Sequence, residues 1–234
     1  MYEPKLGGGN SIVTNGLILN LDAGNASSYN GSGTLWTDLS GQNNNGTLVN
    51  GVGYTSANGG ALTFDGVNDY VSLGNNTAYN LTNFSVSSWF RPTVGGNNYS
   101  PVITRYYNIT PNNGWMIYYH KPTSKIHVEG RESGAQYLSL VSNNIYSINN
   151  WYNITWTKSG NTWSLYVNGT LDRALTLGNG TTPITSNNMQ IGCFNPNDPE
   201  YAKQDVGNVN IYNRVLSASE VTQNFNATKT RFGL

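Results

Sequence analysis

The feature that most limits the fold is a pair of short alternating segments at residues 59–73. Apolar and polar residues alternate in residues 61–64 and again in residues 69–73, which predicts two strands buried on one face only. Residues 65–68 between them read Asp-Gly-Val-Asn, and Asp-Gly is typical of tight hairpin turns. The sequence therefore predicts a β-hairpin here, and with it an antiparallel sheet.

Similar segments recur along the chain and predict an all-β domain. The clearest second hairpin pairs residues 151–158 with residues 162–167 across Ser-Gly-Asn. About a dozen short strands joined by Gly and Asn turns imply a two-sheet antiparallel sandwich. We expect this domain to occupy residues 15–234. The Gly-rich residues 1–14 are weakly patterned and predict a flexible N-terminal arm.

One segment near the C-terminus has helical character. Ser217 and Glu220 form a capping-box pattern, in which each side chain bonds to the backbone amide of the other. Val221 and Phe225 follow at the spacing of an apolar helix stripe. We expect a short helix over residues 217–226, packed against the sandwich.

Composition excludes several classes of function. Only 10% of the 234 residues are charged and the formal net charge is zero. Nucleic-acid binding therefore lacks its main electrostatic contribution. No signal peptide or apolar run of membrane-spanning length occurs, so we expect neither classical export nor membrane insertion. The lone Cys193 lies in a predicted strand, where a buried, inert thiol is expected.

Four segments carry a resemblance to a known family: residues 16–25 (GLILNLDAGN), residues 36–48, residues 64–71 (FDGVNDYV) and residues 211–229. In this order they resemble the laminin-G-like domains of the concanavalin A-like lectin/glucanase superfamily. More narrowly, they are similar to the variant found in structural proteins of tailed bacteriophages. The resemblance implies a curved jelly-roll sandwich with a concave face, and end loops that bind sugars or proteins. It also implies a virion protein that assembles in the host cytoplasm, which agrees with the missing signal peptide.

Glucanases share this superfamily, so glycoside hydrolysis has to be considered. That reaction needs two carboxylates on either side of a sugar site. The superfamily's retaining β-glucanases carry Glu-x-Asp-x-Glu on one strand, and this motif is absent. The nearest acidic pair, Glu129 and Glu132, is interpreted as part of a solvated turn or a surface ion pair. We therefore predict that the protein is not an enzyme.

Many relatives hold one structural Ca²⁺ through carboxylate and backbone oxygens. One argument against such a site is that Asp residues in Asp-Gly and Asn-Asp turns form hydrogen bonds to the turn backbone, which alone explains their presence. In many relatives the strand before residues 211–214 carries an Asp, and this chain has Gly207 in its place. The candidate ligands are Asp22, Asp38, Asp65, Asp69 and Asp205. His120 and His127 flank a predicted hairpin, but two histidines without a further ligand make a poor zinc site, and we interpret them as surface residues.

Aromatic rings and a polar loop supply candidate sugar contacts. A flat ring can stack on a sugar while amides and carboxylates bond to its hydroxyls. The adjacent pairs at residues 106–107 and 118–119 should each turn one ring outward if they lie in strands. Residues 195–201 form a Pro-stiffened loop that ends in an aromatic residue, and we expect it at the rim of a ligand site. The candidate residues are Tyr106, Tyr107, Trp115, Tyr119, Asn195, Asn197, Asp198 and Tyr201.

Three functional hypotheses follow from these observations. The first is a non-enzymatic virion surface protein (fibre, decoration or adhesin) whose lectin-like domain binds host-surface glycans. The second is a purely structural decoration protein that binds only other virion proteins, with residues 1–14 as its anchor. The third is a glycoside hydrolase. A homo-oligomer is compatible with the first two, because virion proteins exploit symmetry.

Overall fold

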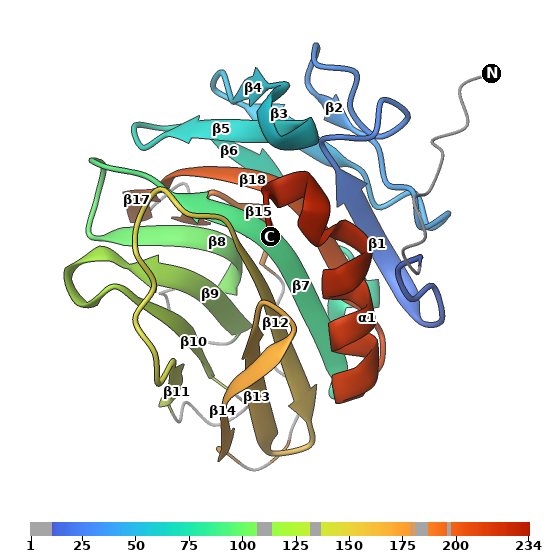
Figure 1. Cartoon of the computed structure of the whole chain (residues 1–234), viewed down its shortest axis with the longest axis vertical. Coiled ribbons are helices and arrows are strands. Elements are labelled where there is room, and N and C mark those ends of the chain that lie inside the picture. The colour runs from blue at the N-terminus through green and yellow to red at the C-terminus, as the bar shows by residue number, and fades with distance from the viewer. Residues whose placement is uncertain (1–10, 107–113, 132–136, 179, 181–186, 196–197) are drawn as a thin grey trace.

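The protein folds into two packed antiparallel sheets with one C-terminal helix (Figure 1). The computed structural model describes residues 11–106, 114–131, 137–178, 180, 187–195 and 198–234. The predicted two-sheet sandwich is confirmed.

The first sheet has eight strands within the described residues, in the order β14-β13-β12-β7-β18-β5-β4, with β1 also paired to β18. The strands are β1 (Leu17–Asp22), β4 (Gly53–Thr55), β5 (Ala61–Asp65), β7 (Phe84–Pro92), β12 (Tyr152–Ser159), β13 (Thr162–Val167), β14 (Thr170–Thr176) and β18 (Lys203–Tyr212). The predicted hairpin at residues 151–167 is confirmed, because β12 and β13 pair with Ser159 opposite Thr162.

The second sheet has the order β11-β10-β9-β8-β15-β6-β3-β2, and a small hairpin of β16 and β17 forms a third sheet. The strands are β2 (Leu35–Trp36), β3 (Gly46–Val49), β6 (Tyr70–Ser72), β8 (Tyr99–Tyr106), β9 (Gly114–His120), β10 (Lys125–Arg131), β11 (Tyr137–Val141), β15 (Gln190–Ile191), β16 (Cys193–Asn195) and β17 (Asp198–Tyr201). Short 3₁₀ helices are η1 (Ala57–Gly59), η2 (Thr77–Tyr79), η3 (Lys121–Thr123) and η4 (Lys229–Phe232).

The segment at residues 61–73 is not a hairpin, so this prediction was wrong. Both strands exist, but β5 pairs with β4 and β18 in the first sheet, whereas β6 pairs with β3 and β15 in the second. The Asp-Gly turn therefore carries the chain from one sheet to the other. Alternation fixes which face of a strand is buried, but the partner is decided by strands far away in the sequence, here β18 at residues 203–212.

Strand β7 shows why the first sheet is buried on both faces. Phe84, Val86 and Phe90 point into the core between the sheets, while Ser87 and Trp89 alternate with them on the outer face. That outer face lies beneath helix α1 (Ala218–Thr228), as Figure 1 shows. A strand covered on both sides loses the simple apolar-polar signal, because its outer polar residues are buried as well.

Helix α1 begins as predicted. The Ser217 hydroxyl accepts from the Glu220 backbone amide, and the Glu220 carboxylate accepts from the Ser217 amide at 2.9 Å. The Phe225 ring stacks on Trp89, with 5.7 Å between centroids. The helix thus anchors the C-terminal segment on the first sheet.

Part of the predicted N-terminal arm packs against the rest of the domain. The Val13 backbone amide donates to Asn224 Oδ1 at 2.8 Å, and its side chain packs with Tyr212, Leu216 and Val221. Residues 11–14 therefore belong to the domain rather than to a flexible arm. Residues 1–10, the rest of the predicted arm, lie outside the described residues.

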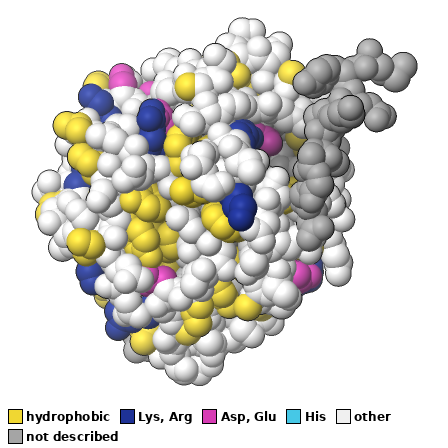
Figure 2. All heavy atoms as spheres, in the orientation of Figure 1, with side chains coloured by type: hydrophobic (Ala, Val, Ile, Leu, Met, Phe, Trp, Pro, Cys, Tyr) yellow, Lys and Arg dark blue, Asp and Glu magenta, His cyan; other side chains and the backbone are white. Residues whose placement is uncertain are grey.

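The surface reflects the low charge content of the sequence. In the view of Figure 2, the charged side chains are few and scattered. Cys193 is buried, as predicted, and burial raises the pKa of its thiol. None of the helices in the described part of the chain is long and apolar enough to span a membrane.

Candidate functional site

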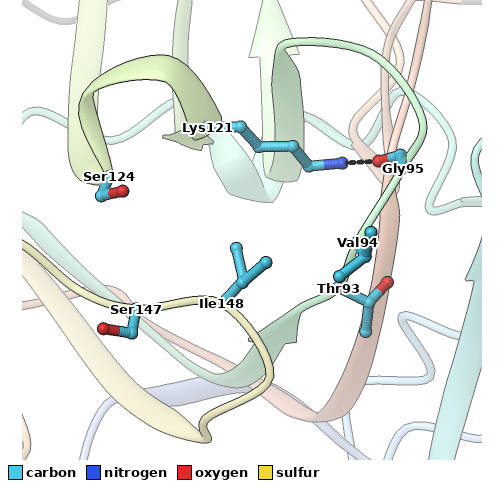
Figure 3. Close-up of a pocket in the computed structure, with 7 residues that line it drawn as sticks. All are labelled: Thr93, Val94, Gly95, Lys121, Ser124, Ser147 and Ile148. Carbon is cyan, nitrogen blue, oxygen red and sulfur yellow. Dashed lines mark hydrogen bonds between the residues drawn. The ribbon is translucent and has the colours of Figure 1, made fainter.

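Three loops at one end of the sandwich enclose a depression of about 420 Å³ (Figure 3). They are residues 93–98 after β7, residues 121–124 between β9 and β10, and residues 142–151 before β12, all on the left-hand side of Figure 1. We call this depression the end pocket. It is lined by Thr93, Val94, Gly95, Lys121, Ser124, Ser147 and Ile148.

Backbone hydrogen bonds hold the three loops together. The Lys121 amide donates to Asn98 O at 2.9 Å, and the Tyr146 amide donates to Ser124 O at 2.7 Å. The Asn149 amide donates to Pro92 O at 2.6 Å. Each loop is therefore tied to a neighbour, which fixes the shape of the pocket.

Asp172 on β14 fixes the start of the third loop. Its carboxylate accepts from the Asn143 amide at 2.6 Å, from Asn144 Nδ2 at 2.8 Å and from the Tyr146 hydroxyl at 2.6 Å. Burial raises the pKa of Asp172, but these hydrogen bonds outweigh it and hold the pKa below its usual value. The loop is thus bonded to an ionised carboxylate across the physiological pH range.

The lining of the end pocket combines hydroxyls with exposed aliphatic side chains. Thr93, Ser124 and Ser147 supply hydroxyls, while Val94 and Ile148 are 62% and 37% exposed. Figure 3 shows Ile148 between the Ser147 loop and the Thr93–Val94 segment, with the Lys121 side chain reaching towards Gly95 O. Such a lining suits a ligand that presents C–H groups on one side and hydroxyls on the other.

The predicted aromatic contacts do not gather at this pocket. Trp115 and Tyr119 are 2% and 0% exposed and pack in the core, so neither ring is available to a surface ligand. Their positions on β9 point them inward, and the outward-facing Tyr118 is covered by other rings. The expected outward ring at residues 118–119 is therefore buried too.

The predicted loop at residues 195–201 lies instead on the hairpin of β16 and β17. Asn195 is half-buried at the end of β16, and Tyr201 is 9% exposed on β17. Tyr106 ends β8 and Asp198 begins β17, but their side chains lie outside the described part of the structure. Tyr107 and Asn197 lie outside the described residues altogether.

Glu129 is not in a solvated turn, so that interpretation was wrong. It is 7% exposed within β10, and its Oε1 accepts from the Tyr118 hydroxyl at 2.7 Å. His127 Nδ1 lies 3.4 Å from the same oxygen, and its ring lies 5.4 Å from that of His120 on the same face of the sheet. Burial raises the pKa of Glu129, but hydrogen bonds from its neighbours hold it below the usual value. Glu132 lies outside the described residues.

The five candidate calcium ligands are spread over the molecule and engaged in local contacts. Asp22 pairs with Arg231, and Asp205 pairs with Arg91. Asp38 organises the loop after β2. Within the described residues, no three His, Cys, Asp or Glu side chains are arranged to hold a metal ion. A Cβ on Gly207 would lie 2.5 Å from the Phe232 ring, which explains the glycine there.

Asp65 and Asp69 lie together in the turn between the sheets. The Asp65 amide donates to both Asp69 carboxylate oxygens, at 3.2 and 3.1 Å. Burial raises the pKa of Asp69 to about 7, and the neighbouring Asp65 carboxylate contributes to the increase. The turn is therefore held by a carboxyl group that titrates near neutral pH.

We predict that this titration makes stability depend on pH. The unfolded chain releases the Asp69 proton near pH 4, whereas the folded protein keeps it to about pH 7. The free energy of unfolding should therefore fall by about 3 kcal/mol between pH 4.5 and pH 8. Urea denaturation of the wild type and of Asp69→Asn tests this. Equal pH dependence in the two proteins would contradict it.

Two packed antiparallel sheets of this kind define a domain with a lectin-like fold. Its family is shown by sequence: the family model described as the concanavalin A-like lectin/glucanases superfamily, of laminin G type, matches residues 65–222. The chain belongs to this superfamily. No curated protein sequence matches it.

Solved structures share the fold at low sequence identity. The binding domain of Paraclostridial Mosquitocidal Protein 1 is 19% identical with a TM-score of 0.72, over 91% of this chain and 52% of that one. The botulinum neurotoxin serotype D binding domain is also 19% identical, with a TM-score of 0.67 and the same coverage. Trypanosoma rangeli sialidase with 2,3-difluorosialic acid is 18% identical, with a TM-score of 0.68 over 95% and 35% of the chains. The chain thus spans about a third to a half of these proteins.

Proposed function

We propose that this domain binds glycans at the end pocket without cleaving them, as the recognition part of a virion surface protein. The observation that carries the proposal is the lining of the pocket, which combines three hydroxyl side chains with an aliphatic platform on tied loops. A sugar ring offers matching chemistry, with hydroxyls at its edge and C–H groups on its face.

Binding without catalysis is supported by the distribution of carboxylates. Glycoside hydrolysis needs two carboxyl groups roughly 5–10 Å apart across the sugar. Among the described residues that line the end pocket there is no Asp or Glu. The buried Glu129 is bonded to Tyr118 and lies in the second sheet, outside this lining.

The virion role rests on the sequence resemblance to bacteriophage structural proteins. The geometry is compatible with it, because the Val13 amide donates to Asn224 of α1. Helix α1 lies on the right-hand side of Figure 1, whereas the pocket loops lie on the left. A chain anchored by its N-terminal segment would present the pocket outward. The toxin structures with this fold are described as binding domains, which favours recognition over a purely structural role.

A glycan array and a cell-binding assay of the purified protein, with and without a calcium chelator, test the proposal. We expect saturable binding that a soluble sugar competes away. If folded protein binds no glycan in either condition, the proposal fails and a structural decoration role replaces it.

We predict that Ile148→Gln weakens glycan binding about tenfold, because it replaces the aliphatic platform by a polar group of similar size. Stability should change little, since Ile148 is 37% exposed. Titration against an array-selected sugar measures the effect. Leu171→Gln is the matched control, because Leu171 is 50% exposed on β14 and does not line the pocket. Equal affinity in both variants would mean that the sugar binds at another site.

A further inference from the structure

Two lysine side chains meet beside the glycine strap of the end pocket, Gly95 and Gly96. Lys121 Nζ donates to Gly95 O. A Cβ placed on Gly95 would lie 3.5 Å from Lys203 Nζ, and one on Gly96 would lie 3.4 Å from Lys121 Nζ. Both ammonium groups therefore reach the same short stretch of backbone, from β18 on one side and from η3 on the other.

Neither lysine has an acidic partner among the described residues. Asp65 stands opposite Lys203 in the pairing of β5 with β18, yet its carboxylate accepts from the Val67 amide and forms no ion pair with the lysine. Lys121 is bonded only to a neutral carbonyl. Burial lowers the pKa of Lys121, and the charge of Lys203 lowers it further. Two like charges are thus gathered where nothing in the described lining neutralises them.

This arrangement contrasts with that of three arginines of the protein. Arg91, Arg214 and Arg231 each pair with a carboxylate. With only 12 basic residues against 12 acidic ones, partners are not scarce. Two cations without acidic partners, Lys121 in the pocket lining and Lys203 beside Gly95, are the arrangement expected for an anionic ligand. Like charges repel until a negative group is placed between them.

We infer that the end pocket recognises an acidic glycan, whose carboxylate or sulfate group binds between Lys121 and Lys203. The inference rests on the proposed glycan-binding function. The anion would replace the neutral Gly95 carbonyl as the partner of Lys121, and charge-assisted hydrogen bonds are roughly twice as strong as neutral ones. The strap of two glycines lets the acidic group approach, since Gly95 and Gly96 carry no side chain and adopt φ of 85° and 68°. The sugar ring would then lie over Ile148 and Val94.

The test compares matched sugars on one array. Each neutral oligosaccharide is printed beside the same core carrying sialic acid, a uronic acid or a sulfate ester, so that carboxylate and sulfate are separated. We expect the acidic member of a pair to bind at least about tenfold more tightly, and the preference to shrink between roughly 50 and 300 mM NaCl.

Substitutions of the two lysines test whether these side chains cause the preference for acidic sugars. Lys121→Gln and Lys203→Gln should each lower the ratio of acidic to neutral sugar affinity about tenfold. Lys229→Gln removes a charge near Phe225, away from the pocket, and should leave the preference intact. Thermal unfolding checks that each variant is folded.

The outcomes separate this inference from the proposed function. Equal binding of the acidic and neutral members of each pair, lost in Ile148→Gln, would overturn the inference and keep the glycan site. An acidic preference that survives both lysine substitutions would also overturn it. Absence of binding to every sugar would remove both proposals together.

Discussion

Replacing Trp156 by alanine is expected to lower the free energy of unfolding by about 3–5 kcal/mol, the largest effect we predict for one side chain. Trp156 is fully buried on β12, between the two sheets. Its ring centroid lies 4.8 Å from that of Phe84, 4.9 Å from Trp163 and 5.3 Å from Trp115. Truncation removes all three contacts and leaves a cavity that the surrounding sheets cannot fill by a local shift.

Urea denaturation followed by intrinsic fluorescence measures this effect. Leu171→Ala is the control, because Leu171 is 50% exposed on β14 and should change stability by no more than about 0.5 kcal/mol. Trp156→Phe should fall between the two, since it keeps an aromatic ring in the same place. A loss below about 1 kcal/mol for Trp156→Ala would show that the core repacks around the gap.

The sequence predicted local structure better than it predicted strand partners. The capping box at Ser217 and the hairpin around Ser159 are local patterns, and both were confirmed. The turn at Asp65 was equally well marked, yet it joins strands of different sheets. Turn chemistry fixes a change of direction, but the partner of β5 is set by β18, more than a hundred residues away.

The candidate pocket could not be predicted from the sequence. Its lining comes from three loops that have no motif in common, and they meet only because β7, β9 and β11 end at the same edge of the sandwich. Aromatic composition favoured Trp115 and Tyr119 instead, which the fold buries. A large ring is more often part of a core than of a binding site, and composition alone does not show which of the two it is.

Asp38→Asn is expected to lower the free energy of unfolding by about 3 kcal/mol, because this carboxylate organises the loop between β2 and β3. Its Oδ1 accepts from the Asn20 amide at 2.8 Å and the Ser40 amide at 2.9 Å. Its Oδ2 accepts from the Ser40 hydroxyl at 2.7 Å and the Asn44 amide at 3.0 Å. An asparagine in this position would turn an NH₂ group towards two of these donors.

The same four bonds decide whether Asp38 can serve as a calcium ligand. A carboxylate offers about four acceptor positions, and here all four face N–H or O–H donors. A cation at either oxygen would have to displace one of these donors and leave it unpaired in a site that is 7% exposed.

We therefore expect CaCl₂ or EDTA to shift the thermal midpoints of the wild type and of Asp38→Asn equally, because a ligand stabilises only the fold that binds it. Differential scanning fluorimetry over a calcium titration measures this. A calcium-dependent rise in the wild type that Asp38→Asn abolishes would contradict the assignment. It would mean that the loop rearranges to coordinate the ion. Without that rise, Asp38 is a hydrogen-bonding centre that shapes the loop through four donors.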